Sequence, residues 1–463
     1  MVTIKKNAAF AYYKEAANKA APTFANSAGS RLRLLRIVNE DLNTVFQRDE
    51  SNEVRGDAQS SGSVIVSASG TGSIAYQFSL DTFDDLVVGM LFAADDLGTG
   101  REDGWLQGGF TALANILASP ASVTFDGADD SFNSAAAFAR APAAGERIYV
   151  RGFGNKNLDT VFVVKTGSTT SKIPVENDTG DSNGVDSYAG VTGTVVGSAV
   201  TIAPVKGYTR NGTFDRPFGL VRMYSDSSLA GTTSTDGLAS CDWSLFRGAY
   251  ITGFQMACAP GQAGWTGSFS VLFSDENAIT DASASTNAGG FDIDNWNEVE
   301  VLNANPLTNA ITGPVMIRLR KDGGALSTAT RVDPLSFNIN VSNNASEVQA
   351  CRNRGAIAII QGTFGISVAM SLLYIDSAFH SAMLADSYYE VEIGVADADG
   401  RCWLFRFPKA RLTSSRPNPG KNQPIAQALE FKCEAGGTGF VGAAGTGRMI
   451  ECLSFYVRDA GAA

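Results

Sequence analysis

The stretch SVIVSASGTGSIAYQFSLDTFDDLVVGMLFA, residues 63–93, decides how this chain folds. It begins with a short apolar run, and the Gly-Thr-Gly segment at residues 70–72 then predicts a turn. After that turn, Ile74, Tyr76 and Phe78 alternate with small or polar residues. A period of two is typical of a strand with one buried face, so this part predicts two strands around a glycine turn.

The end of the same stretch has a different period. Asp81 is of a residue type that caps helices, and the apolar positions after it are spaced at i, i+3, i+4, i+7 and i+8. These positions are Phe83, Leu86, Val87, Met90 and Leu91. The stretch therefore predicts a unit of strand, turn, strand and short amphipathic helix.

Composition favours a mainly β fold with more than one domain. The chain has 463 residues, which is enough for two to four domains, and 44% of them are hydrophobic, which allows a sizeable core. Only 18% are charged, below the usual quarter. The 49 glycines, with abundant Ser, Thr, Ala and Asn, favour strands and tight turns over helical bundles.

Charge and hydropathy exclude several classes of protein. The net charge is −11, whereas tight binding of nucleic acid needs clustered cations. An acidic surface past which nucleic acid slides without sticking remains compatible with this charge. No apolar run approaches the roughly 18 residues that span a bilayer, and residues 1–24 lack the apolar segment of a signal peptide. We therefore expect no membrane partner and no secretion.

Residues that would support catalysis or metal binding are few. The single histidine, His380, excludes a His-His zinc motif, and nothing near it resembles the nucleophile turn of a Ser-His-Asp enzyme. The G-x-G-x-x-G match at residues 437–442 lacks a strand-helix-strand context. The six cysteines form no C-x-x-C pair and are expected to be reduced and mostly buried. We therefore expect no enzyme activity, no metal and no cofactor.

A weaker copy of the opening unit lies late in the chain. Residues 356–373, AIAIIQGTFGISVAMSLL, predict two strands around a glycine turn. The helix after them is predicted from Asp376, Phe379, Met383 and Leu384. An Arg-Gly pair precedes each unit, at residues 55–56 and 354–355, and a Trp with Leu-Phe-Arg follows each, at residues 243–247 and 403–406. This recurrence predicts an internal duplication.

The duplication sets the predicted domain order. Residues 1–30 form an N-terminal arm, which is either poorly ordered or a tether onto a neighbouring subunit, with a short helix as an option. Residues 31–118 and 211–280 form a first β domain, interrupted by a small all-β module at residues 119–210, and residues 285–463 form a second. Two similar domains in one chain would let three chains fill the six places of a closed ring without exposed sheet edges.

Five separated stretches of apolar positions and turns carry a family resemblance. The first, LRLLRIVNEDLNTVFQRDESNEVRGD, reads as a strand followed by a loop. The stretches are residues 32–57, 72–93, 147–167, 244–273 and 391–433. Together they span most of residues 31–433, and the chain there resembles the tail tube (major tail) proteins of bacteriophages with long, non-contractile tails.

The resemblance implies two tandem tail-tube-like β-sandwich or barrel domains, each with a flanking short helix, plus the inserted β module. It also implies a structural virion protein that self-assembles into stacked rings, with trimeric rings of pseudo-hexameric symmetry forming a channel for the genome. An acidic channel lining would fit the net charge. The implied partners are further copies of the chain, the tape measure protein and DNA transiently in the lumen, and other tail proteins at the ends. The implied locations are the virion and, during assembly, the host cytoplasm.

Two loops match, by position, the loop through which one ring packs on the next in this family. They are residues 47–57 and residues 342–354. The contact residues implied in the first loop are Gln47, Arg48, Asp49, Glu50, Glu53, Arg55 and Asp57. Those implied in the second are Glu347, Arg352 and Arg354.

Two other functions are compatible with the residues alone. An extracellular adhesin or surface-layer protein would also be β-rich, but the missing signal peptide and the unpatterned cysteines disfavour it. A glycan-active or other β-rich enzyme would need two convergent carboxylates, and the sequence shows only scattered ones.

Overall fold

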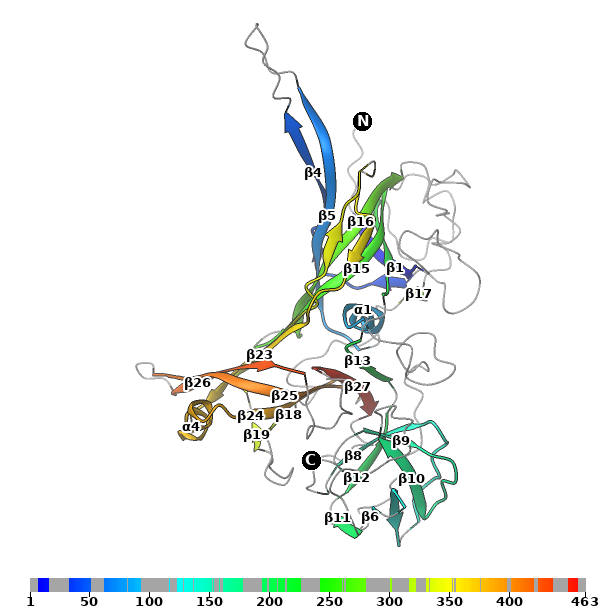
Figure 1. Cartoon of the computed structure of the whole chain (residues 1–463), viewed down its shortest axis with the longest axis vertical. Coiled ribbons are helices and arrows are strands. Elements are labelled where there is room, and N and C mark those ends of the chain that lie inside the picture. Colours follow the sequence, from blue (N-terminus) through cyan, green and yellow to red (C-terminus); the bar gives the residue numbers. More distant parts are fainter. Residues whose placement is uncertain are drawn as a thin grey trace.

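The structure is a computed structural model. It describes residues 7–15, 33–50, 62–80, 82–92, 116, 123–127, 129–135, 137–151, 153, 158, 161–177, 194–197, 200–205, 207–212, 215–225, 242–259, 261, 264–279, 300–301, 316–321, 330–332, 334–351, 353, 355–374, 376–397, 401–419, 424–435 and 449–456. Strands make up most of these residues, as the composition predicts (Figure 1).

The elements follow one another along the chain in three groups. The first group is β1 (Asn7–Lys14), β2 (Arg33–Leu35), β3 (Asn39–Glu40), β4 (Asn43–Glu50), β5 (Ser63–Gln77) and α1 (Asp84–Met90). The second is β6 (Val123–Asp126), β7 (Ser131–Ser134), β8 (Arg147–Arg151), β9 (Val161–Val164), β10 (Lys172–Asn177), β11 (Thr194–Gly197), β12 (Thr201–Pro204), β13 (Gly207–Arg210), β14 (Phe218–Ser225), β15 (Asp242–Cys258) and β16 (Thr266–Ile279). The third is β17 (Glu300–Val301), β18 (Met316–Lys321), β19 (Thr330–Val332), β20 (Ser336–Ser342), β21 (Ser346–Val348), β22 (Ala358–Ile360), β23 (Gly365–Leu373), α4 (Ala378–Leu384), β24 (Tyr388–Ala396), β25 (Arg401–Asn418), β26 (Ala426–Cys433) and β27 (Glu451–Tyr456).

Two sets of seven strands share one order. In the first set β4, β5, β16, β15, β14, β1 and β2 lie side by side, each antiparallel to the next. In the second set β20, β23, β26, β25, β24, β18 and β19 do the same. A short helix follows the second strand of each set, α1 after β5 and α4 after β23. One chain therefore forms the same order of strands, with the same connections between them, twice.

Two bulges align the sets residue by residue. One lies at Thr252 of β15 in the first set and at Thr413 of β25 in the second. The other lies around Gly219 of β14 and around Glu390 of β24, and it gives the same alignment. Because a bulge marks one specific residue in a ladder, these positions correspond more securely than residue types do. The predicted match of Leu-Phe-Arg at residues 245–247 with residues 404–406 is accordingly wrong by two residues.

The helices end alike and extend the alignment. Phe92 (φ 48°) follows α1 and Asp386 (φ 51°) follows α4, each in the left-handed region. The backbone N–H of Phe92 donates to the carbonyl of Gly89, and that of Asp386 donates to the carbonyl of Met383. Met90 of α1 therefore corresponds to Leu384 of α4.

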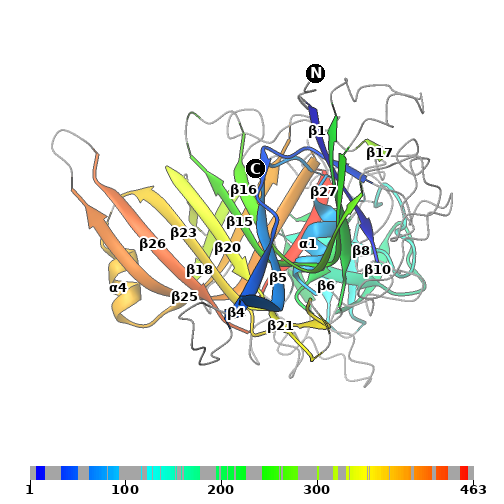
Figure 2. The same ribbon diagram turned by 90° about the horizontal axis from the view of Figure 1, so that it is seen from above.

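The two sets join into one continuous sheet. The first part of β15 pairs with β14, but residues 253–258 pair with β20 of the second set. The strands β4, β5, β16, β15, β20, β23, β26 and β25 therefore run across the molecule as a single curved sheet, seen from above in Figure 2. Outside this series, β27 pairs with the first part of β25 and with β13, β3 pairs with β5, β17 pairs in parallel with β2, and β21 pairs with β22.

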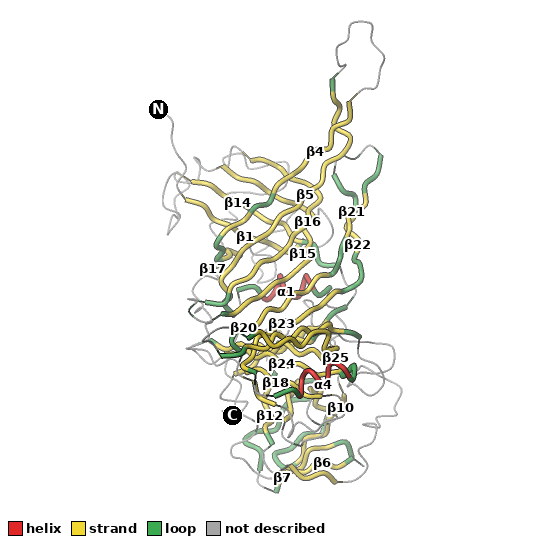
Figure 3. The backbone as a smooth tube through the Cα atoms, turned by 90° about the vertical axis from the view of Figure 1, so that its left-hand side faces the viewer, coloured by secondary structure: helices red, strands yellow, loops and turns green. Residues whose placement is uncertain are grey.

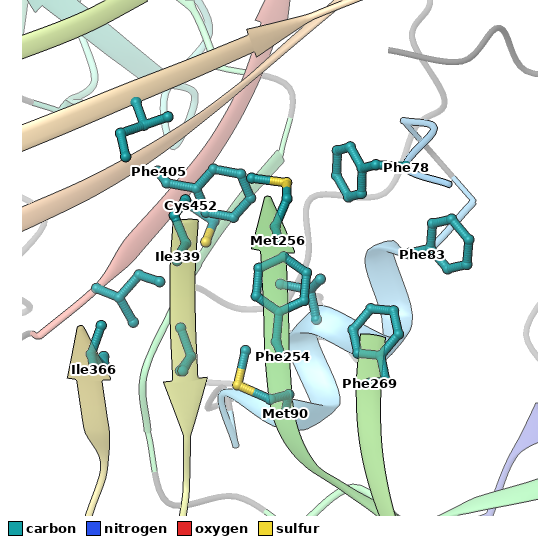
Figure 4. Close-up of a cluster of buried hydrophobic side chains, with 14 of the residues drawn as sticks. Phe78, Phe83, Met90, Phe254, Met256, Phe269, Ile339, Ile366, Phe405 and Cys452 are labelled. Carbon is teal, nitrogen blue, oxygen red and sulfur yellow. The ribbon is translucent and has the colours of Figure 1, made fainter. Parts of the chain in front are cut away.

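One hydrophobic core lies behind this sheet and spans both sets (Figure 4). Tyr76 of β5 is near its centre, with its ring centroid 4.8 Å from those of Phe83 and Phe269. Phe254 of the first set stacks on Phe405 of the second at 6.0 Å. Aromatic pairs at such separations add to the stabilisation from burial, so the core also holds the two sets together.

The inserted module is a separate sheet with its own core. Its strands lie in the order β11, β6, β7, β10, β9, β8 and β12, and Phe125, Phe132 and Phe162 are among the residues that fill it. β13 falls inside the range predicted for the module, yet it pairs with β27 beside the second set. The chain therefore enters the module from the first set and, after the module, runs beside the second set through β13.

The predicted Gly-Thr-Gly turn is wrong. Gly70 and Gly72 lie inside the single strand β5, which pairs with β4 on one side and β16 on the other. A Cβ atom on Gly70 would lie 2.3 Å from the Phe273 ring, and one on Gly72 would lie 2.6 Å from the Leu42 Cα. These glycines permit close packing of neighbouring chain segments and do not reverse the chain.

The predicted arm is also wrong for residues 7–14, which form β1 between β14 and β2. Phe10, Tyr12 and Tyr13 are buried there, because a continuous apolar run suits a strand covered on both faces. The remainder of residues 1–30, apart from Glu15, lies outside the described residues.

The two predicted helices are confirmed as α1 and α4. All five apolar residues predicted to face the core from α1 are buried. Asp81 lies outside the described residues, and α1 begins after Phe83 without a side-chain cap. The two strands predicted at residues 356–373 are present as β22 and β23, although β22 pairs with β21.

Candidate assembly surfaces

The β4–β5 hairpin projects away from the body of the molecule (Figures 1 and 3). Gln47, Arg48 and Asp49 pair with Ser67, Ile65 and Val64 across the hairpin, and Glu50 pairs with Ser63. The prediction that a loop begins at Gln47 is therefore wrong. These polar residues belong to a strand because a projecting two-stranded ribbon exposes both faces, so side chains at successive positions can be polar. The side chains of Gln47, Arg48 and Asp49 are exposed.

The remaining predicted contact residues divide into two groups. Glu53, Arg55, Asp57, Arg352 and Arg354 lie outside the described residues, so their stacking role stays a prediction. Glu347 is described, and it lies in β21 paired with Ile359 of β22. The second predicted loop therefore contains β21, the first strand of a small hairpin that β22 completes.

Glu347 turns back towards the first set. Burial raises the pKa of its carboxyl group, which outweighs the lowering by hydrogen bonds from the backbone N–H of Gly70 and from Gln349. Since Gly70 belongs to β5, Glu347 fastens the β21–β22 hairpin beside the base of the β4–β5 hairpin, where Figure 3 shows them adjacent. The structure thus brings the two predicted stacking regions together on one side of the molecule.

Apolar side chains are exposed on both hairpins. On β4 and β5 they are Val45, Phe46, Val64 and Val66, and Val64 is 70% exposed. On and beside β22 they are Ile357 and Ile360. Soluble monomers rarely collect such residues on a projecting element, and collections of this kind mark contact surfaces.

The continuous sheet has an open edge at each end. In the described part of the chain, β4 has one strand neighbour, β5. At the other end, residues 412–418 of β25 pair with β26 alone among the described strands. Open edges are templates for pairing with another chain.

One face of the continuous sheet is polar and largely uncharged. It carries the residues between the buried positions of each strand, among them Ser73, Gln255, Ser268, Ser270, Asn338, Asn340, Ser367 and Ser371. Uncharged residues of β15, β16 and β20 also line a shallow hollow of about 460 Å³ on the sheet. The charged residues described on this face include Glu430 and Lys432 of β26, near one end.

Helix α1 is held in the first set by a buried carboxylate. Asp85 accepts a hydrogen bond from the Tyr12 hydroxyl at 2.9 Å and pairs with Lys14 Nζ at 3.0 Å and with Arg33. Burial alone would raise the pKa of Asp85, but the two cations and the hydrogen bonds outweigh it and hold the pKa below its usual value. In the second helix, α4, the position of Asp85 is occupied by Phe379, whose ring centroid lies 6.1 Å from that of Tyr389.

Buried charges also connect the second set to the inserted module. Glu390 of β24 pairs with Arg320 of β18 and with Arg406 Nε of β25, the latter at 2.6 Å. Glu392, two residues along β24, accepts a hydrogen bond from the Tyr149 hydroxyl of β8 at 3.4 Å. A buried network of this kind fixes one arrangement of its partners, because removing any member leaves a charge buried.

Histidine, cysteine and carboxylate side chains do not gather into a metal site in the described residues. No group of three or more His, Cys, Asp or Glu residues in them could hold a metal ion. His380 lies exposed on α4. Of the cysteines that the structure covers, Cys258, Cys402, Cys433 and Cys452 are buried and Cys351 is exposed. No described helix is long and apolar enough to cross a membrane.

Comparisons with known proteins give two partial structural matches and one match to a family model. Two solved structures are similar to part of this chain: the anti-feeding prophage baseplate and the virion of a native gene transfer agent particle. Each match has 11% sequence identity and a TM-score of 0.21, and each covers 26% of this chain. The matches cover 88% of the baseplate chain and 92% of the gene transfer agent chain. No curated protein matches the sequence. A family model described as phage tail tube protein matches residues 5–433, so the chain belongs to the phage tail tube protein family.

Proposed function

We propose that this protein builds the tube of a phage tail by assembling into stacked rings, and that the tube is a channel for passage of the genome into the host. The observation that carries the proposal is the continuous sheet with an open edge at each end, β4 and the last part of β25. A curved sheet of this kind removes its edges by pairing end to end with further copies.

The fold favours a ring of three chains. The two strand sets have one order and shared bulge positions, which supports two tube-like units per chain, residues 31–118 with 211–280 and residues 285–463. β1, at residues 7–14, adds to the first unit, while β6–β12 form the module between. Three such chains give a ring with pseudo-hexameric symmetry.

The uncharged polar face of the continuous sheet is proposed to line the channel. Serine, asparagine and glutamine side chains keep water in the bore and offer no cation cluster to hold phosphates. DNA and the tape measure protein would pass along this surface transiently. The net charge led us to expect an acidic channel lining. We propose a neutral lining instead, because the described residues on this face are mostly uncharged.

The β4–β5 and β21–β22 hairpins are proposed to pack against the adjacent ring. They lie on one side of the molecule and expose valine, phenylalanine and isoleucine side chains. Burying these residues between rings would stabilise the stack. Other tail proteins would contact the same surfaces at the ends of the tube. Assembly would take place in the host cytoplasm, and the assembled tube would be part of the virion.

Electron microscopy of the purified protein in negative stain tests the proposal. We expect hollow rings or tubes of uniform bore, and light scattering should give rings with the mass of three chains. The variant Val64→Ser/Val66→Ser, with both substitutions at exposed sites, should form rings that no longer stack. Monodisperse monomers at high concentration, across salt and pH, would overturn the proposed function.

A further inference from the structure

The junction between the two strand sets inside one chain is known in atomic detail. Residues 253–258 of β15 pair with β20, and the backbone N–H of Asn343 donates to the carbonyl of Thr252 at 3.0 Å. The fully buried Asn343 side chain donates to the carbonyls of Met90 (3.1 Å) and Ile251 (2.9 Å). The junction therefore consists of a strand pair, the end of helix α1 and the residue that follows β20.

The β15 side of this junction has its equivalent in β25 of the second set. The β20 side has its equivalent in β4 of the first set. The bulges place Ser414, Ser415 and Arg416 of β25 at the positions of Gly253, Phe254 and Gln255. The pairing of β5 with β4 and of β23 with β20 places Asn43, Thr44, Val45 and Phe46 at the positions of Asn340, Val341, Ser342 and Asn343. These repeated segments are the two open edges of the continuous sheet.

We infer that the junction between neighbouring chains copies the junction inside the chain, so that residues 413–416 of β25 and Leu384 of α4 in one copy bind residues 43–46 of β4 in the next. The inference rests on the proposed ring and specifies its interface. The register follows from the internal pairs Gly253–Ser342, Phe254–Val341 and Gln255–Asn340. It places Ser414 opposite Val45, Ser415 opposite Thr44 and Arg416 opposite Asn43.

The backbone of both edges fits this register. The N–H of Asp41 donates to Ser73 of β5, so the alternate residues Leu42, Thr44 and Phe46 direct their backbone groups to the outer edge. In this register, the hydrogen-bonded pairs between the two copies are Phe46 with Thr413 and Thr44 with Ser415. The pairing ends at Leu42, which lies opposite Pro417. Proline lacks an N–H there, but the Leu42 N–H already donates to Glu40 (3.0 Å), and its carbonyl accepts from Arg222 (3.3 Å).

The apolar residues of the two edges also fit. Met90 of α1 is 1% exposed because the internal junction covers it, whereas its counterpart Leu384 is 73% exposed. Phe46, the counterpart of Asn343, is 41% exposed. Phe46, Thr44, Gly70 and Phe273 line a hollow of about 310 Å³ at the base of the β4–β5 hairpin. A Leu384 side chain from the next copy would occupy this hollow as Met90 occupies the internal site.

One difference between the two junctions has a physical reason. In the first set Phe92 stacks on Tyr250, with ring centroids 6.4 Å apart. At the same two positions the second set has Asp386 and Arg411, which form an ion pair at 2.9 Å. The internal junction is buried from the moment the chain folds, whereas the outer one meets water before assembly, so charged residues there keep the free subunit soluble.

Disulfide trapping tests the register. The variant Asn43→Cys/Arg416→Cys, with Cys241 and Cys351 replaced by Ser, should form chain-to-chain disulfides on mild oxidation of assembled protein, giving covalent trimers on a non-reducing gel. Each single-cysteine variant should remain monomeric on the gel. The matched variant Gln255→Cys/Asn340→Cys reproduces the internal pair and should close within one chain, which confirms that the geometry permits oxidation.

A second variant separates this inference from the proposed function. Leu384→Ser should leave unfolding of the isolated chain unchanged and raise the concentration needed for ring formation roughly ten- to hundred-fold. Val64→Ser, equally exposed but outside the junction, should leave ring formation unchanged. Rings that form normally with Leu384→Ser, or that fail to trap the cysteine pair while the internal control closes, would overturn the inference and leave the ring intact. A wild-type protein without rings would overturn both.

Discussion

Removing the charge of Asp85 should destabilise the first strand set strongly. In Asp85→Asn the Tyr12 hydroxyl can still find an acceptor, but Lys14 and Arg33 lose the anion that faces them. These two cations are only 23% and 22% exposed, so water replaces the carboxylate incompletely. Breaking a fully buried ion pair costs about 3–5 kcal/mol, and partial hydration of the partners reduces this to about 2–4 kcal/mol. That is a large part of the roughly 5–15 kcal/mol that stabilises a typical domain.

The loss should depend on pH with a definite sign. Because the folded-state pKa of Asp85 lies below its usual value, its stabilisation is complete above the unfolded pKa of about 3.9 and disappears as pH falls through the folded pKa. The asparagine variant has no such titration. The difference in free energy of unfolding between wild type and variant should therefore be constant near neutral pH and shrink below about pH 4.

Urea unfolding of unassembled chains, followed by the fluorescence of the buried Trp265 and Trp403, measures this difference. Asp386→Asn is a matched control, because its carboxylate also pairs with an arginine but is 65% exposed, and it should cost less than about 1 kcal/mol. Equal stability of Asp85→Asn and wild type at pH 7, or a difference that persists undiminished at low pH, would refute this account of how α1 is held.

Three further substitutions or reactions probe other parts of the fold. Gly72→Ala should lower the free energy of unfolding by roughly 1–3 kcal/mol or more, since the added Cβ would meet the Leu42 backbone; a tolerated alanine, seen as an unchanged urea midpoint, would contradict the close approach. Asn343→Ala should cost about 2–3 kcal/mol by leaving buried carbonyls without donors, and an unaltered thermal midpoint would show that the junction does not depend on them. Burial raises the pKa of the Cys402 thiol to about 12, so alkylation of the native protein at pH 8, read by mass spectrometry, should label Cys351 and spare Cys402 until the chain unfolds.

Local pattern predicted the elements well where one face of a strand or helix is buried. The spacing of Phe83, Leu86, Val87, Met90 and Leu91 predicted α1, and all five residues lie in the core. Such spacing works because burial on one side imposes a period that no other local structure shares. The same reasoning predicted the helix α4.

Prediction failed where one residue type serves two physical purposes. Gly70 and Gly72 could mark a turn or a close approach, and only the positions of Phe273 and Leu42 decide between them. The polar residues from Gln47 to Glu50 could begin a loop or form part of a projecting ribbon, and the choice depends on their pairing with β5. The predicted alignment of residues 245–247 with residues 404–406 was wrong by two residues because bulges, which set the register, leave no mark in residue type.

The sequence by itself determined the mainly β class, the two strand-and-helix units, the resemblance to tail tube proteins and the absence of a recognisable catalytic motif. The class, the units and the lack of a motif follow from periodicity, composition and spacing, which are properties of neighbouring residues, whereas the resemblance rests on the five stretches that carry it. Only the tertiary structure decided that the two units share one continuous sheet and one core, that β4 and β25 form its open edges, and that Met90 is covered while Leu384 is exposed. These features depend on contacts between residues far apart in the chain, and no local pattern specifies which distant segment a strand edge will meet.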